Sequence, residues 1–176
     1  MFLLIPILFF VAYFNLLYRA QIGIRHFLIV FPYLLAFAAS VLRDASLPTR
    51  RAMYSLAALG LYLAASTLSY FPHFMPYLNE LVPDRRLGYR VLADSNIDWG
   101  QSAWVVTQWQ KEHPAAVFEP EGPQTGEVVV AVNDLVGVSS DEEKYRWLRE
   151  NFVPDEVIAY THLVYRIDQD ELASLR

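Results

Sequence analysis

The sequence predicts an α-helical membrane part followed by a small α/β domain. Apolar side chains make up 55% of the 176 residues, and they gather in three uncharged stretches of the first 71. The same 71 residues carry five Arg and one Asp, whereas residues 72–176 carry nine Lys or Arg against eighteen Asp or Glu. One folded domain rarely separates charge and apolar content so sharply, so two unlike parts are expected.

The three uncharged stretches are interpreted as transmembrane helices at about residues 1–18, 27–42 and 52–71. The first would be about 27 Å long as a helix, close to the hydrocarbon thickness of a bilayer. A cleaved signal peptide is the alternative, but no basic segment precedes the apolar run and no small-x-small cleavage pattern follows it. Pro32 lies inside the second stretch and indicates a kinked helix in a bundle.

The loops between these stretches predict the orientation. Residues 43–51 contain three Arg, whereas residues 19–26 contain two Arg and one His. The positive-inside tendency therefore places residues 43–51 in the cytoplasm. Since helices alternate in direction, the acidic part after Phe71 is expected to be extracytoplasmic. The prediction is a multi-pass protein of the plasma (inner) membrane.

The acidic part is predicted to contain a linker and a domain. Residues 72–100 are expected to form a linker at the membrane interface, because Pro72, Pro76 and Pro83 interrupt any long helix and aromatic side chains suit that interface. Residues 101–176 are expected to form the α/β domain.

Hydrophobic spacing predicts the elements of this domain. Apolar residues at helical spacing predict a short helix over residues 102–112. Runs of β-branched residues predict strands over residues 128–132 and 157–167. Between them, a serine followed three residues later by a glutamate predicts a helix over residues 140–151. A strand, helix and strand with a crossover of this length favour a parallel strand pair.

Composition and motifs exclude several classes of function. The chain has no cysteine, which removes disulfides, thiolate metal sites and a cysteine nucleophile. A net charge of −5 argues against a basic nucleic-acid-binding protein. The sequence contains no P-loop, GxGxxG, GxSxG or HExxH motif. His73, His113 and His162 show no metal-ligand spacing and are assigned no role.

Arg25 and His26 are candidates for binding a phosphate. They lie where a predicted helix enters the membrane on its outer face. Arginine offers a bidentate fork to phosphate oxygens, and histidine can add a hydrogen bond. The alternative is that these residues only flank a span and extend their charges toward water.

The segment Asp94–Asp98 places oxygen-bearing side chains at alternate positions, as at the start of a calcium loop. Later positions of such a loop need Gly and Glu, but the sequence has Trp99 and Val105 there, so an EF-hand is excluded. A looser calcium site stays an alternative, and capping of the following helix is the simpler role. Asn79 and Glu80 could bind a hydroxylated ligand or lie in a surface turn.

Three segments resemble the C-terminal part of multi-spanning glycosyltransferases of family 39: IGIRHFLIVFPYL at 22–34, YFPHFMPYLNEL at 70–81 and GYRVLADSNIDWGQ at 88–101. This family comprises the bacterial relatives of dolichyl-phosphate-mannose protein mannosyltransferases, also called phospholipid-carrier-dependent glycosyltransferases. The end of the chain is also similar, with VAVNDLVGV at 130–138, YRWLREN at 145–151 and VIAYTHLVYRI at 157–167. The resemblance implies a GT-C membrane fold that moves a sugar from a polyprenyl-phosphate carrier to an acceptor on the outer face.

The resemblance also implies where catalysis takes place. In this family an acidic pair in the first outer loop acts as base toward the acceptor hydroxyl and can orient a divalent metal. Before position 80 this sequence has one acidic residue, Asp44, on the predicted cytoplasmic side, so no catalytic residue carries over. The chain is therefore expected to be the C-terminal portion of an enzyme whose N-terminal transmembrane part is missing here. A shortened paralogue without catalysis is the alternative.

The resemblance gives roles to two groups of residues. Arg25 would stabilise the charge that grows on the leaving lipid phosphate, and His26 would assist. A second group would line or brace the acceptor side: Asn79, Glu80, Asp94, Asn96, Asp98, Trp99 and Gln101. The expected partners are membrane lipid and a polyprenyl-phosphate-linked sugar, with no nucleic acid. The competing hypothesis is a non-catalytic, membrane-anchored module that binds a sugar or a protein through its acidic domain.

Overall fold

The computed structural model describes residues 2–17, 27–44 and 49–174. The chain divides into two compact units, Met1–Ser66 and Thr67–Arg176. Each unit is described by itself.

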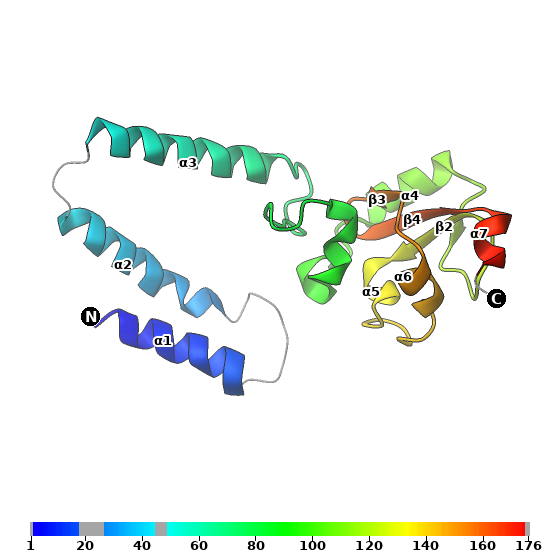
Figure 1. Cartoon of the computed structure of the whole chain (residues 1–176), viewed down its shortest axis with the longest axis horizontal. Coiled ribbons are helices and arrows are strands. Elements are labelled where there is room, and N and C mark those ends of the chain that lie inside the picture. The colour runs from blue at the N-terminus through cyan, green and yellow to red at the C-terminus, as the bar shows by residue number, and fades with distance from the viewer. Residues whose placement is uncertain (1, 18–26, 45–48, 175–176) are drawn as a thin grey trace. The chain divides into compact units, whose positions relative to one another are not determined.

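The first unit consists of helices. They are α1 (Leu4–Ala12), a π-helical turn η1 (Tyr13–Leu17), α2 (Phe31–Asp44) and α3 (Arg50–Leu68), whose last residues belong to the second unit (Figure 1). α1 contacts α2. Ile7 and Val30 are buried, whereas most large apolar side chains described in these helices are exposed. The described part of this unit therefore has only a small core.

The three predicted membrane spans are wrong. α1 and α2 contain 9 and 14 residues, so they are about 14 and 21 Å long against about 30 Å of bilayer hydrocarbon. α3 has 19 residues, but it begins with two arginines and includes serine, threonine, tyrosine and glycine, which lower its mean hydropathy. No helix in the described ranges is both long and apolar enough to cross a membrane. This finding overturns the predicted membrane fold, and with it the predicted multi-pass location in the plasma membrane.

The second unit is an α/β structure built on a four-stranded sheet. Its strands are β1 (Val117–Phe118), β2 (Gly126–Ala131), β3 (Glu156–Ile158) and β4 (His162–Ile167). Its helical segments are η3 (Arg85–Arg90), η4 (Asp94–Asn96), α4 (Ala103–Glu112), α5 (Val132–Leu135), α6 (Arg146–Asn151) and α7 (Gln169–Ala173). The strand order is β1-β2-β4-β3, and only the β1–β2 pair is parallel.

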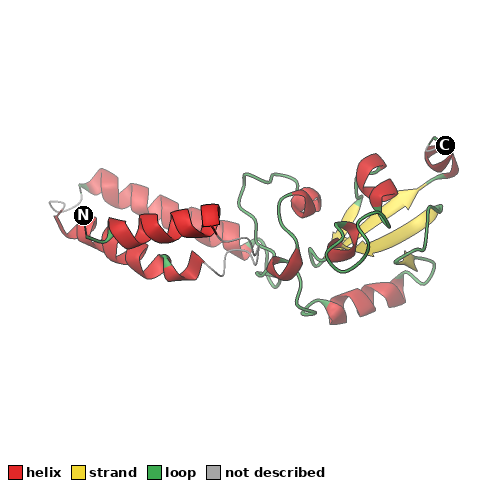
Figure 2. Cartoon of the chain, turned by 90° about the horizontal axis from the view of Figure 1, so that it is seen from below, coloured by secondary structure: helices red, strands yellow, loops and turns green. Residues whose placement is uncertain are grey.

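Helices lie over both faces of the sheet (Figure 2). The central strands carry buried apolar side chains on both faces. On one face, side chains of β2 and β4 join α5, α6 and the η3–η4 segment in the larger core cluster: Tyr89, Ile97, Val128, Val130, Val132, Leu135, Tyr145, Leu148, Leu163, Tyr165 and Ile167. On the other face, Val129, Val164 and Ile158 pack against α4. The predicted helix over residues 102–112 is confirmed as α4, and its apolar stripe covers this second face.

The predicted parallel pairing of residues 128–132 with residues 157–167 is wrong. β2 and β4 are antiparallel, with Val129 opposite Val164. The run 157–167 is a hairpin of β3 and β4, because the chain turns at Ala159 and Tyr160, which both adopt the left-handed conformation. The predicted helix over residues 140–151 begins later, at Arg146, as α6. The Ser140 hydroxyl does not cap this helix and instead donates to the carbonyl oxygen of Asp134 in α5 at 2.8 Å.

Candidate functional site

The first candidate site is a pocket in the segment that follows α3. It has a volume of about 210 Å³ and is lined by Tyr70, Leu78, Asn79, Glu80, Val82, Pro83 and Arg85. A water molecule takes about 30 Å³ in the liquid, so the pocket has room for a single sugar ring rather than an oligosaccharide. Asn79 and Glu80, two of the predicted acceptor-side residues, thus lie together in one pocket wall.

Arg85 forms a fixed wall of this pocket. Its guanidinium lies 4.0 Å from the ring centroid of Tyr70, a cation–π contact. Nη1 donates to the carbonyl of Ser69 at 3.1 Å and to the hydroxyl of Tyr160 at 3.0 Å, and Nη2 donates to Ser69 Oγ at 2.5 Å. Most of its donors are therefore used within the protein. Arg85 supports the pocket instead of offering a bidentate fork to a phosphate.

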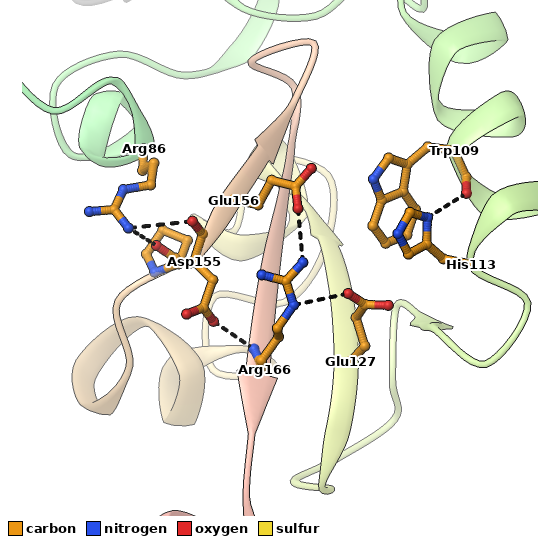
Figure 3. Close-up of polar contacts among 8 residues, drawn as sticks. Arg86, Trp109, His113, Glu127, Asp155, Glu156 and Arg166 are labelled. Atoms are coloured by element: carbon orange, nitrogen blue, oxygen red, sulfur yellow. Dashed lines mark hydrogen bonds and ion pairs between the residues drawn. The ribbon is translucent and has the colours of Figure 1, made fainter.

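The segment that carries Arg85 is tied to the sheet by Arg86. Asp84 caps η3, and its Oδ1 accepts from the backbone N–H of Arg86 at 3.0 Å. The side-chain hydrogen bonds from Arg86 hold the pKa of Asp84 below its usual value. Arg86 Nη1 also donates to the carbonyl oxygens of Pro154 at 3.1 Å and Asp155 at 3.4 Å, just before β3 (Figure 3). These contacts hold the pocket wall against the strand hairpin.

The segment Asp94–Gln101 is a loop whose polar side chains bond to the loop itself. Gln101 Oε1 accepts from the backbone N–H of Trp99 at 2.6 Å, and its Nε2 donates to a backbone carbonyl of the loop at 2.8 Å. Asp98 Oδ1 accepts from the N–H two residues further on at 2.8 Å. Asn96 Nδ2 donates to the carbonyl three residues back at 3.3 Å. These contacts brace the loop. The predicted capping of the following helix is not seen, because the first turn of α4 has no side-chain cap.

The same loop presents an exposed tryptophan. Trp99 Nε1 donates to the carbonyl of Ser95 at 2.6 Å, while 61% of the residue's surface stays accessible. Asp94, in the left-handed conformation, donates its backbone N–H to Asn133 Oδ1 at 2.7 Å. The loop is therefore fixed to α5, and the indole ring is held in a defined orientation.

His162 lies beside two acidic side chains at the end of the sheet where β2 ends and β4 begins. It begins β4 opposite Ala131, at the end of β2. Its Nδ1 lies 3.0 Å from Thr161 Oγ1. Burial lowers the pKa of His162, and the negative charges of Asp98 and Asp134 oppose this effect. Asp98, a predicted site residue, thus lies near a histidine for which no role was predicted.

Glu119 and Asp134 form an acidic pair at the same end of the sheet. Glu119 follows β1, and Asp134 lies in α5 just after β2. Since these strands are parallel, their carboxyl ends meet at one edge. Burial and the Asp134 carboxyl raise the pKa of Glu119, while Lys144 lowers it. Glu119 therefore takes up a proton at a higher pH than an isolated glutamate.

On the α4 face, a row of charged side chains crosses three strands. Arg166 of β4 donates through Nε to Glu127 of β2 at 3.2 Å and through Nη2 to Glu156 of β3 at 2.9 Å (Figure 3). Near this row, the Trp109 and His113 rings are stacked with centroids 3.8 Å apart. The charges in this row are paired with one another, so we assign the row a structural role.

The metal implied by the family resemblance has no site in the described part of the chain. No group of three or more His, Asp or Glu side chains among those residues could hold a metal ion, so we derive no step through a metal. Arg25 and His26 lie outside the described residues. Their predicted phosphate-binding role stays a prediction.

Comparison of the chain with models of known protein families, with curated proteins and with solved structures finds no match. The resemblance to family 39 therefore rests on the sequence motifs alone.

Sequence reasoning missed several residues of these sites. The contact among Tyr70, Arg85 and Tyr160 joins distant positions of the sequence, so no local spacing predicts it. Asp134 had a usable signal, because an acidic residue just after a buried strand lies at the sheet edge. His162 had no such signal, because the predicted strand over residues 157–167 placed it in the middle of a strand, whereas it begins β4.

Proposed function

We propose that this chain is a portion of a glycosyltransferase that takes a sugar from a polyprenyl-phosphate carrier. Within it, residues 67–176 bind a carbohydrate. The pocket of Tyr70, Asn79, Glu80 and Arg85 is the observation that carries this proposal. Four of its lining residues, Tyr70, Leu78, Asn79 and Glu80, belong to the segment 70–81 that resembles family 39, and its volume suits one sugar ring.

The chemistry of the pocket suits sugar hydroxyls. Each hydroxyl both donates and accepts hydrogen bonds, a carboxylate only accepts, and a carboxamide does both. Glu80 and Asn79 supply such groups next to each other, and Asn79 is oriented because its Oδ1 accepts from the backbone N–H of Leu81 at 3.2 Å. Apolar side chains of Leu78 and Val82 complete the wall and can pack against the C–H groups of a sugar.

The proposal assigns no catalytic residue to this chain. Arg25 and His26 would bind the phosphate of the carrier, as the GIRH motif implies. The carbohydrate pocket would hold the sugar or the acceptor and would leave bond breaking to carboxylates elsewhere in the enzyme.

The test measures the binding of two probes to the full chain by saturation-transfer NMR. The first probe is a set of methyl hexosides, and Glu80→Gln should weaken their binding about tenfold, because a hydrogen bond to a charged group is lost. The control is Glu142→Gln, an exposed glutamate distant in sequence from the pocket residues. Absence of hexoside binding, or an equal effect of the control, would refute the carbohydrate pocket.

The second probe is a short-chain polyprenyl phosphate. Arg25→Ala should weaken its binding about tenfold, whereas Arg51→Ala, an arginine outside the motif, should not. If hexosides bind but the phosphate binds equally to wild type and Arg25→Ala, the chain is a sugar-binding module without the carrier function.

A further inference from the structure

We infer that a second saccharide-binding pocket lies between the segment before β2 and helix α7. This pocket has a volume of about 590 Å³ and is lined by Gln124, Thr125, Gln169, Asp170, Leu172 and Ala173. The volume falls within the range of about 300 to 1,000 Å³ that is typical of small-molecule sites. It has room for a short saccharide.

The fold fixes both walls of this pocket. The start of β2 and the end of β4 are paired, with Gly126 opposite Ile167, so the residues just before β2 lie beside those just after β4. α7 is closed by a capping box: Asp168 Oδ1 accepts from the N–H of Glu171 at 2.7 Å, and Glu171 Oε2 accepts from the N–H of Asp168 at 3.1 Å. Leu172 packs against the larger core cluster. A ligand would therefore meet a largely preformed site.

The lining selects a neutral ligand with many hydroxyl groups. Two carboxamides, from Gln124 and Gln169, offer both donors and acceptors, and the Thr125 hydroxyl does the same. Asp170 supplies the one formal charge among the lining residues, and it is negative. Among the described residues that line the pocket there is no cation for a phosphate or carboxylate ligand and no aromatic ring for a planar base. Leu172 and Ala173 provide an apolar side for the C–H groups of a sugar.

One donor of this pocket lacks an acceptor. Gln124 Nε2 is buried and has no hydrogen-bond partner among the described residues. Buried amide groups are nearly always paired in folded proteins. A sugar hydroxyl in the pocket could supply the acceptor through a small rotation of the Gln124 side chain.

This pocket is separate from the pocket around Arg85. Tyr160, which contacts Arg85, precedes β4, whereas Gln169 follows β4. The six residues of β4 cover about 20 Å. The inference does not depend on the proposed function, because neither pocket uses a residue of the other.

The test is titration of the ¹⁵N-labelled full chain with maltose, cellobiose and lactose, observed through the side-chain amide signals of Gln124 and Gln169. At least one disaccharide should shift both signals in a saturable way. Gln169→Ala and Asp170→Asn should each weaken this binding about tenfold, because the first removes a carboxamide and the second replaces a charged acceptor by a neutral one. The matched control is Gln110→Ala, an exposed glutamine on α4, which should bind as wild type does.

Three results would overturn the inference. The first is no shift of either amide signal with any of the disaccharides. The second is an unchanged affinity in both Gln169→Ala and Asp170→Asn, with backbone spectra that show a folded chain. The third is an equal shift with inorganic phosphate or with a simple amine. Glu80→Gln should leave these shifts unchanged, so failure of the first pocket and failure of this one are distinguishable.

Discussion

Replacement of Tyr165 by phenylalanine is expected to stabilise the second unit. Tyr165 is 1% exposed in the middle of β4. Its hydroxyl oxygen is buried and has no hydrogen-bond partner among the described residues. Burial raises the pKa of this hydroxyl far above its ordinary value, so the group stays neutral. A buried polar group without a partner opposes folding.

The magnitude follows from the cost of that hydroxyl. A buried donor or acceptor left unsatisfied costs about 1 to 3 kcal/mol. Phenylalanine keeps the ring and removes only the oxygen, so little packing is lost. We therefore expect Tyr165→Phe to raise the free energy of unfolding by about 1 kcal/mol, which corresponds to roughly 4 °C in Tm for a unit of this size.

Tryptophan fluorescence during urea denaturation measures this change. All four tryptophans lie within Thr67–Arg176, so the signal reports on the second unit. The matched control is Tyr70→Phe, because the Tyr70 hydroxyl donates to the carbonyl of Leu78 at 3.0 Å. Loss of that bond should lower the free energy of unfolding by about 1 kcal/mol.

The two variants must therefore change stability in opposite directions. A loss of stability in Tyr165→Phe equal to that in Tyr70→Phe would mean that the Tyr165 hydroxyl makes a bond in the folded protein, and the reasoning would fail.

Two further predictions concern a turn and the acidic pair. Gly137 has φ +78°, and an added Cβ would come within 2.7 Å of the Cα of Glu142, so Gly137→Ala should cost at least about 2 kcal/mol in urea denaturation. Gly100→Ala, at φ +81° with open space around it, should cost only about 1 kcal/mol, and equal costs would contradict the predicted clash. The raised pKa of Glu119 beside Asp134 means that the folded state binds a proton more tightly than the unfolded state, so its stabilising effect is present at low pH and is lost as pH rises through the folded pKa. Glu119→Gln should therefore raise stability by about 0.5 kcal/mol near pH 7, a value kept small by solvent screening, and the gain should vanish near pH 4; a gain that persists there would contradict this assignment.

Local periodicity predicted the parts of the fold that depend on one segment. The apolar spacing over residues 102–112 predicted α4, and the β-branched run over residues 128–132 predicted most of β2. The pairing direction of β2 and β4 was out of reach. It depends on a turn at Ala159 and Tyr160, two residues that give no glycine or asparagine signal for a left-handed conformation.

The membrane prediction failed for a related reason. Counting uncharged residues over 1–18, 27–42 and 52–71 measures apolar length but not where a helix begins and ends. The helices that form are shorter than the first two runs, and α3 takes two arginines into its first turn. Apolar composition by itself therefore did not determine the length of these helices.

The candidate site was predictable only where its residues are neighbours in sequence. Asn79 and Glu80 were predicted together and share one pocket wall. Asp98 and Gln101 were predicted as site residues, and the structure uses them to brace a loop. Arg85 reaches Tyr160, 75 positions away. A single sequence carries no spacing rule for such a contact.

The lengths of the four strands bear on how the sheet behaves toward other chains. The two inner strands have six residues each, whereas the outer strands β1 and β3 have two and three. A foreign strand that approached either border would find few exposed amide and carbonyl groups to extend the ladder. This arrangement works against fibril growth by edge-to-edge addition.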